Sequence, residues 1–539
     1  MNIMRISGLA SGMDTESIVE SLMKVERMRL DGLNQTKQLA LWKQEQYNEI
    51  NKELANFIIQ TRKELELTLT TSYGTTLSNS ISNLNWVKKA SSSNENVLTA
   101  KATSQAVQGT HKIQVEQLAE GVNIASKHAV KTTDGKQATL ITRLSQLGVE
   151  EDGTITFAKK VNLNGVEQEI NISVSYEKDT TIHELVQKIN QAVGELGIQK
   201  NISLGIQASF DEMTGRLFLS TKDTGEYAQI KVVDDKQGLF TGAGNKFNLY
   251  ESGETDEPLL TAQIDPETGE VRSDVKFKKG QDAIIHFDGA ENLRYSSNTF
   301  LLNGIQIDLK SADPGKEYTI KVETDVDSVF DKIKSFVEKY NALVEKLNSK
   351  LSEKRYRDYL PLTDEQKKAL KEDEIKKWEE KAKSGLLRND EMIERIVQNM
   401  RLSLYEKVEG TSKYNLLSSI GITTGEWNEK GKLVIDESKL KQAILDDVDG
   451  VINLLFAPTD SENPEKTGLV NRVYDRMIEG MKEIIDKSGT GENKELYRSV
   501  QSNILVDFVT NMGSISYLDL DLIELEKRII EEQTRLAQT

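Results

Sequence analysis

The chain has 539 residues, no cysteine, and 69 Lys and Arg against 86 Asp and Glu, which gives a net charge of −17. This charge argues against nucleic acids and anionic membranes as partners, because both require a basic surface. The missing cysteines exclude disulfides, thiolate metal sites and cysteine nucleophiles. No apolar run is long enough for a membrane helix, and residues 1–6 lack the pattern of a secretory signal. The length predicts roughly three or four domains.

The first predicted element is a helix from about Thr15 to about Leu69, in two pieces. Asp14 is a good N-cap for it. The second piece carries the stronger apolar stripe, formed by Tyr47, Ile50, Leu54, Phe57, Ile58 and Leu65. All six prolines fall between Pro258 and Pro464, so both ends of the chain are free to form long helices.

A Ser-, Thr- and Asn-rich segment, residues 68–85, separates this helix from a β-rich middle. Alternating apolar residues there predict strands, and Asn164-Gly165 and Asn303-Gly304 are typical of type I′ hairpin turns. One helix interrupts the strands, where Thr181 and Glu184 form a capping box. The middle is long enough for two domains.

The second half of the sequence is predicted to be mostly helical. Apolar residues from Val326 to Leu351 keep helical spacing without a miss. Thr363 and Gln366 form a capping box, and Asn389 is expected to cap a later helix. The simplest assembly is an α+β multidomain fold. In it, one helical bundle joins both halves of the chain, the β-rich middle is an insertion, and both termini emerge together.

The last predicted helix carries an apolar seam at heptad spacing. Its members are Ile515, Leu518, Leu522, Leu525, Ile529 and Leu536. Glu532 is the one polar residue in this seam. Short seams of this kind also occur in ordinary bundles, so packing on the helix's own domain is an alternative. The proline-free helix starting near Thr15 is the expected coiled-coil partner.

Patterns for catalysis, cofactors and metals are missing from the sequence. The four histidines are scattered, and His183-Glu184 has Gln187 where a second zinc-binding histidine would be needed. The acidic tract 446–450 does not fit a calcium loop, because Leu445 and Phe456 fall where oxygen ligands are required. We therefore expect a protein that is not an enzyme and has no catalytic, cofactor or metal site.

The N-terminal segment 6–15 resembles the signature of the bacterial flagellar filament cap proteins, the flagellar hook-associated protein 2 (FliD) family. The signature residues carried over are Gly8, Leu9, Ala10, Ser11, Gly12, Met13 and Asp14. Further matches lie at Ser297-Asn298, Asn303-Gly304-Ile305, Asp325, Phe336-Val337, Tyr340-Asn341, Gly385 to Asp390, Ile420-Gly421, Gly431-Lys432-Leu433, Asp436 and Leu440. The resemblance runs from end to end.

This resemblance implies a terminal coiled-coil leg, a helical bundle, and two β-rich inserted domains that form a plate. The expected ranges are 1–42 and 508–539 for the leg, 43–77 and 323–507 for the bundle, 78–123 and 246–322 for an inner β-rich domain, and 124–245 for an outer one. Family members usually continue past this point with an aromatic and methionine-bearing tail, and this sequence departs from that pattern at Thr539.

The resemblance also implies a homo-oligomer, a ring of about five subunits at the distal tip of the filament. The ring guides flagellin into place and prevents its loss. The other expected partners are the hook-filament junction proteins and a flagellar export chaperone. The location is extracellular, after export by the flagellar type III apparatus without a cleaved signal.

Two other functions stay open at this stage. One is another flagellar axial protein, such as a junction component with the same helical ends. The other is a surface adhesin whose β-rich plate binds host glycans. Labelling would separate the first, because a cap is found only at the filament tip. A fragment from about Ser78 to Lys321 that binds no carbohydrate would count against the second.

Overall fold

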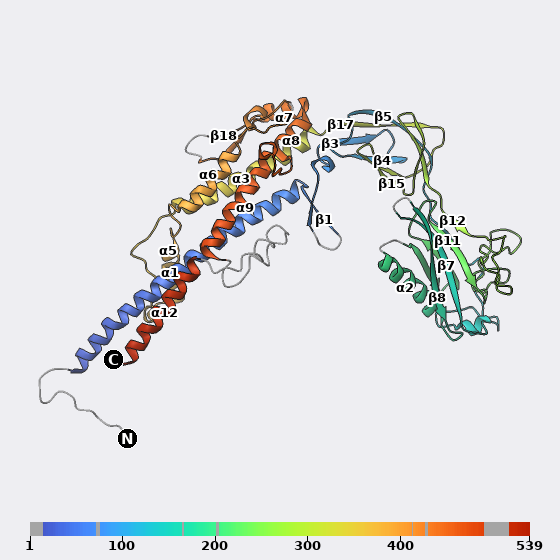
Figure 1. The fold of residues 1–539 in the computed structure, drawn as a ribbon, viewed down its shortest axis with the longest axis horizontal. Helices are drawn as coiled ribbons and strands as arrows, with labels where there is room; N and C mark the ends of the chain where they lie inside the picture. The colour runs from blue at the N-terminus through green and yellow to red at the C-terminus, as the bar shows by residue number, and fades with distance from the viewer. Residues whose placement is uncertain are drawn as a thin grey trace, which may run out of the picture. The chain divides into compact units, whose positions relative to one another are not determined.

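The computed structural model describes residues 15–71, 76–163, 166–200, 204–411, 413–425, 430–489 and 517–538. The chain divides into two compact units (Figure 1). Unit 1 comprises residues 1–87 and 324–539 and is mostly helical, whereas unit 2, Lys88–Glu323, is mostly β-sheet. The α+β fold with a β-rich insertion, predicted from the sequence, is therefore confirmed.

Unit 1 is built around one unbroken helix, α1 (Thr15–Glu64). The prediction of two pieces is wrong. The helix contains no proline and a single glycine, Gly32, so nothing in its sequence forces a break. Where the spacing of the apolar residues changes, the buried face of the helix moves round its axis and the helix continues. The helix is also shorter than predicted, because Glu66 adopts a positive φ of 55° and Thr68–Thr70 forms strand β1.

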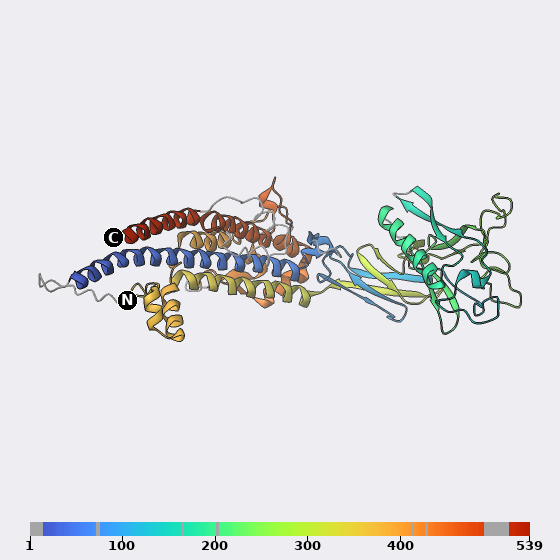
Figure 2. The same ribbon diagram turned by 90° about the horizontal axis from the view of Figure 1, so that it is seen from below.

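Three helices form a bundle with the second half of α1. They are α3 (Val326–Ser352), α6 (Glu391–Ser403) and α9 (Leu469–Ser488), seen side by side in Figure 2. The Asp325 side chain caps α3 by accepting a hydrogen bond from the Ser328 amide. Asp390, and not the predicted Asn389, caps α6, because Asn389 has a left-handed φ of 53°. These helices enclose the apolar core of the unit.

The remaining described elements complete unit 1. They are β2 (Thr76–Ser78), η1 (Ile81–Asn83), α4 (Asp364–Ala369), α5 (Glu372–Lys383), η3 (Leu417–Ile420), β18 (Ile422–Thr424), β19 (Leu433–Ile435), α7 (Glu437–Asp446), α8 (Val448–Phe456), η5 (Pro464–Lys466) and α12 (Tyr517–Gln538). The capping box of Thr363 and Gln366 at α4 is confirmed. In the acidic tract, Asp447 caps α8 by accepting from the Gly450 amide, so this carboxylate serves a helix end.

Two sheets that share an apolar core form one part of unit 2, built from its first and its last strands. One has the strand order β14-β13-β5-β17-β3 and the other β15-β16-β4. The strands are β3 (Lys88–Ser92), β4 (Leu98–Ala102), β5 (Gly109–Gln117), β13 (Ala283–Phe287), β14 (Ala290–Tyr295), β15 (Thr299–Leu302), β16 (Ile305–Leu309) and β17 (Glu317–Thr324). Asn303 and Gly304 have φ of 51° and 78°, as the predicted type I′ turn between β15 and β16 requires.

Two further sheets and a helix enclose the other core of unit 2. The sheets have the orders β12-β11-β7-β8 and β6-β10-β9. The elements are β6 (Asn123–Ala125), η2 (Leu144–Leu147), β7 (Gly153–Leu163), β8 (Val166–Tyr176), α2 (Ile182–Lys200), β9 (Ile206–Asp211), β10 (Arg216–Thr221), β11 (Gln229–Asp235) and β12 (Lys278–Lys279). The predicted turn Asn164-Gly165 lies outside the described residues.

The outer domain extends further along the chain than predicted. Leu249 and Leu260 are buried in the same core as Phe157 and Phe240, so the predicted boundary at residue 245 falls inside this core. Strand β12 at Lys278–Lys279 pairs with β11 and also belongs to these sheets. Residues 246–278 contain few regular elements, so their sequence pattern did not show that this segment packs into the outer core.

Candidate functional site

Helix α12 packs lengthwise on the first half of α1 (Figures 1 and 2). In the predicted seam, Leu522 and Ile529 are buried and Leu525 is half-buried. Leu518 and Leu536 belong to α12, but the structure does not describe their side chains. Ile515 lies outside the described residues. The described seam residues therefore bury apolar surface between two terminal segments of the chain.

Two ion pairs show that α1 and α12 run antiparallel. The Lys37 Nζ lies 2.7 Å from the Glu526 Oε1, and the Arg29 Nε lies 3.8 Å from the Glu532 Oε1. The number on α1 falls as the number on α12 rises, which only antiparallel helices allow. These cross-helix contacts fix the register of the leg.

Glu532, the polar residue within the seam, is buried with only 8% of its surface exposed. The Arg535 guanidinium lies 3.0 Å from its carboxylate, and Arg29 approaches it from the other helix. Burying a carboxylate without cations nearby would lower the stability of the fold by roughly several kcal/mol. The two arginines offset this cost and allow Glu532 to be buried in the seam. The sequence alone does not reveal this role of Arg29, because Glu532 lies at the far end of the chain.

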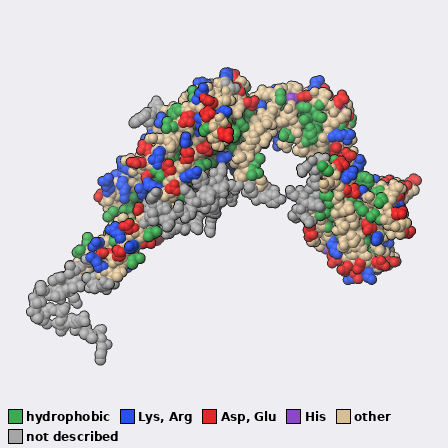
Figure 3. Space-filling view, viewed as in Figure 1, with side chains coloured by type: hydrophobic (Ala, Val, Ile, Leu, Met, Phe, Trp, Pro, Cys, Tyr) green, Lys and Arg blue, Asp and Glu red, His purple; other side chains and the backbone are tan. Residues whose placement is uncertain are grey.

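Apolar side chains on both leg helices also face water. Val25 and Met28 of α1 are 63% and 65% exposed, and Ile523 and Ile530 of α12 are 54% and 62% exposed. On the face drawn in Figure 3, charged side chains of both signs and apolar side chains are mixed along these helices. Both helices of the pair therefore keep large apolar side chains in contact with water.

The start of the bundle is fastened by side chains of α1. Gln44 donates to the Ser488 carbonyl at 2.6 Å, and Gln46 donates to the Lys383 carbonyl at 2.9 Å. One residue further along α1, the Tyr47 hydroxyl donates to the Asp390 carboxylate, and burial together with this carboxylate raises the pKa of Tyr47. These bonds join α1 to the ends of α5 and α9 and to the N-cap of α6.

The predicted signature from Gly8 to Asp14 lies outside the described residues. Family models nevertheless cover both ends of the chain. The model for the N-terminus of flagellar hook-associated protein 2 matches residues 11–121, and the model for its C-terminus matches residues 280–538. The chain belongs to the flagellar hook-associated protein 2 family. The flagellin hook IN motif also matches residues 160–223.

Relatives named flagellar hook-associated protein 2 match over most of the length. One from Halalkalibacterium halodurans is 29% identical, over 99% of this chain and 97% of the relative. One from Thermotoga maritima is 23% identical, over 82% of this chain and 80% of the relative. The structure of the D1-D2-D3 domains of the flagellar cap protein FliD from Escherichia coli covers 86% of this chain and 99% of its own, with a TM-score of 0.51 and 18% identity. This last likeness shows the shared fold.

Membrane-spanning helices and metal-binding clusters do not occur in the described part of this family member. No helix there has both the length and the apolar composition that crossing a membrane requires. Groups of three or more His, Asp or Glu side chains placed to hold a metal ion are likewise missing from the described residues.

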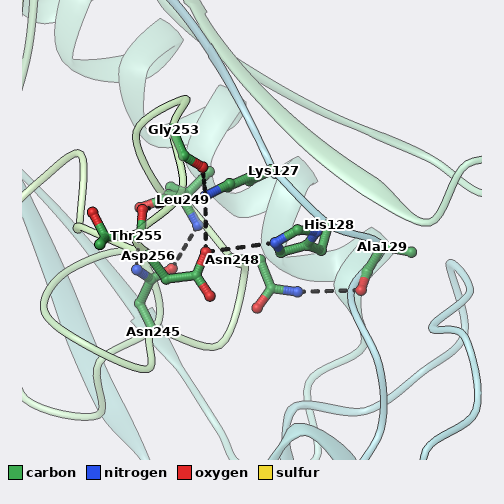
Figure 4. A network of polar contacts seen from close by, with 9 residues as sticks. All are labelled: Lys127, His128, Ala129, Asn245, Asn248, Leu249, Gly253, Thr255 and Asp256. Atoms are coloured by element: carbon green, nitrogen blue, oxygen red, sulfur yellow. Dashed lines mark hydrogen bonds and ion pairs between the residues drawn. The ribbon is translucent and has the colours of Figure 1, made fainter.

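A polar network in unit 2 fastens the irregular segment 245–256 (Figure 4). The Lys127 ammonium donates to the Gly253 and Thr255 carbonyls at 3.0 and 3.3 Å and to the Asp256 carboxylate at 2.9 Å. Lys127, and more weakly His128, holds the pKa of Asp256 below its usual range. One lysine thus holds three points of a loop that has little secondary structure.

Replacing Lys127 by methionine is expected to loosen this loop. Backbone amides of residues 250–258 should exchange with deuterium about tenfold faster, because hydrogen bonds from a charged donor are among the stronger ones. Lys131→Met, at an exposed position four residues after Lys127, is the control and should leave the exchange unchanged. Equal exchange in both variants would show that Lys127 does not hold the loop.

Proposed function

We infer that the protein is the structural cap at the distal tip of the bacterial flagellar filament, where it promotes insertion of flagellin and prevents flagellin loss. The observation that carries this function is the match to both ends of the family, residues 11–121 and 280–538. The fold supports it, because those ends meet in one helical unit with the β-rich domains inserted between them. The comparisons favour this role over a junction protein or an adhesin.

The mechanism we propose is mechanical and non-enzymatic. Copies of the chain form a ring of about five subunits by family resemblance. The leg, residues 15–42 with α12, enters the lattice of flagellin subunits. Its exposed Val25, Met28, Ile523 and Ile530 support this role, since they offer apolar contact area on an otherwise charged helix pair. The signature Gly8 to Asp14 precedes α1 and is proposed to belong to the same leg.

The remaining partners follow from the same function. The chain is proposed to leave the cell through the flagellar type III apparatus without a cleaved signal and to act outside the cell. A flagellar export chaperone binds it beforehand. The hook-filament junction proteins are its neighbours before the filament grows. The proposed role requires no cofactor.

Deleting residues 1–43 is expected to abolish filament growth. In a flagellated bacterium that lacks its own cap, the full chain should restore filaments, whereas the deletion variant should leave flagellin as monomers in the medium. A label on the full chain should appear only at the filament tip. Normal filaments with the deletion variant, or label at the hook junction, would contradict the cap function.

A second variant separates capping from export, because the deletion could remove an export signal. Val25→Asp with Met28→Asp changes two exposed side chains of α1 and leaves the N-terminal segment intact. We expect this variant to reach the medium and still fail to support filaments. Leu445→Asp, on an exposed position of α7 in the bundle, is the matched control and should retain filament growth.

A further inference from the structure

A two-stranded hairpin of unit 1 presents a pair of leucines to water. Strands β1 and β2 pair only with each other among the described residues. Leu69 lies directly opposite Leu77, and each is 52% exposed. Residues paired across antiparallel strands point to the same face, so these side chains form one apolar knob. Two-stranded hairpins are marginally stable in water, and a further partner would stabilise this one.

The base of the hairpin is held firmly to the bundle. The Asn79 amide donates to the Leu67 carbonyl at 2.9 Å, and its side chain donates to the Glu66 carbonyl at 2.8 Å. Trp86 donates to the Leu65 carbonyl at 3.2 Å and is buried against Phe456. The knob is thus carried on a fixed base, a favourable condition for a specific contact.

A shallow apolar groove lies elsewhere in unit 1, between the end of α6 and the β18-β19 hairpin. Its volume is about 250 Å³, and its lining includes Leu404, Tyr405, Leu416, Ile422 and Leu433. Tyr405 and Leu416 remain 47% and 37% exposed. The groove has the volume of roughly eight water molecules, which suits the eight carbon atoms of two leucine side chains.

One wall of the groove is fixed in place. The Tyr405 hydroxyl hydrogen-bonds to the Thr424 Oγ1 at 2.6 Å, which turns the ring edge toward β18. The lining contains no charged side chain. An apolar knob could therefore enter without leaving a buried charge unpaired.

The knob and the β18 side of the groove lie in uncharged stretches of this chain, and the Arg401 guanidinium lies beside the groove, 5.7 Å from the centroid of the Tyr405 ring. Charged residues make up 29% of the sequence, yet none occurs from Leu67 to Val87 or from Tyr414 to Gly425. Two copies, each with a net charge of −17, repel one another, so contacts between copies require surfaces of low charge. Low charge on both surfaces removes this repulsion locally and so favours a second copy of the same chain as the partner.

We propose that the Leu69/Leu77 knob of one copy binds the Tyr405/Leu416 groove of the next copy in the ring. The two surfaces belong to different parts of unit 1, so the contact is head-to-tail, the type of contact that gives a ring when the rotation between neighbours closes. The proposal rests on the proposed function and adds the surfaces through which neighbours recognise each other. Its area is smaller than the ~1,200–2,000 Å² of a stable interface, so it acts together with other contacts of the ring.

Cross-linking between two single-cysteine chains tests this contact. The natural chain has no cysteine, so an introduced thiol is the only one present. Leu77→Cys chains mixed with Leu416→Cys chains should give a cross-linked dimer under mild oxidation that neither variant gives alone. Ile141→Cys, at a site 80% exposed in unit 2, replaces either partner as the control and should give no such product.

A charge placed on the knob should abolish the product. Adding Leu69→Glu to the Leu77→Cys chain is expected to reduce cross-linking by about tenfold or more, because a carboxylate in an apolar groove is costly. Circular dichroism of each variant checks that it is folded. Val107→Glu, a change at an exposed site of unit 2, is the matched charge control and should leave the yield unchanged.

Sedimentation of the unmodified full chain separates this inference from the proposed function. Rings that form while the Leu77→Cys and Leu416→Cys chains give no cross-linked dimer would overturn the knob-and-groove contact and leave the cap function standing. A chain that stays monomeric at all concentrations would overturn both. Ring formation together with the specific cross-link supports both.

Discussion

Replacing Phe336 by alanine is expected to lower the free energy of unfolding of unit 1 by about 3–5 kcal/mol, the usual cost of removing a buried aromatic ring. Phe336 of α3 is buried, and its ring centroid lies 5.7 Å from that of Phe57 and 6.4 Å from that of Tyr474. Phe57 and Tyr474 are themselves 6.3 Å apart. This triangle of rings joins α1, α3 and α9, so the cavity would open where three helices meet.

Tryptophan fluorescence isolates the effect on unit 1. All four tryptophans, residues 42, 86, 378 and 427, fall within the ranges of unit 1. The urea midpoint reported by fluorescence should therefore fall in Phe336→Ala, while unit 2 unfolds as before by circular dichroism. Phe277→Ala removes a 40% exposed ring of unit 2 and is the control. An unchanged fluorescence midpoint in Phe336→Ala would refute the role of the triangle.

The second large effect is expected from Leu522→Asp combined with Ile529→Asp. Both side chains are buried in the seam of α12, and two carboxylates there would lack cations placed like those around Glu532. Burying them would cost several kcal/mol, roughly, so α12 should separate from α1 rather than keep them buried. The bundle should stay folded because its core does not depend on α12. Filaments should fail and flagellin should appear in the medium.

Spin labels measure the separation directly. Asn34→Cys and Arg528→Cys are exposed positions that lie between the two cross-helix ion pairs. The distance between labels at these sites should be short and narrowly distributed in the otherwise unchanged chain, and long and broad in the seam variant. Ile523→Asp with Ile530→Asp changes two exposed residues of the same helix and should keep the short distance. A short distance in the seam variant would contradict the role of the seam.

Local signals in the sequence predicted local structure well. The capping box at Thr363 and the turn at Asn303-Gly304 were predicted because their causes lie within four residues. The cap of α6 was misplaced by one residue because both Asn389 and Asp390 can cap. The choice follows from the turn that precedes the helix, where the Asn389 amide donates to the Leu351 carbonyl at 3.0 Å.

Long-range packing decided what the local pattern left open. The predicted outer boundary at residue 245 was wrong because Leu249 and Leu260 return to a core formed largely by earlier strands. The knob and the groove of unit 1 were not predicted either. A strand of three residues and a groove built from four separate segments leave little periodicity to detect.

The terminal seam shows clearly which properties the sequence determines and which depend on the tertiary structure. The sequence by itself determined that residues 517–538 form a helix with one apolar face, because side-chain spacing alone sets that property. The structure confirmed the expected partner, α1, whereas the antiparallel direction of the two helices and the approach of Arg29 to Glu532 were decided only by the tertiary structure. The sequence could not determine these contacts because the partners lie far apart in the chain. Lys37 and Glu526, for example, are 489 positions apart, and their pairing depends on how the whole of unit 1 folds.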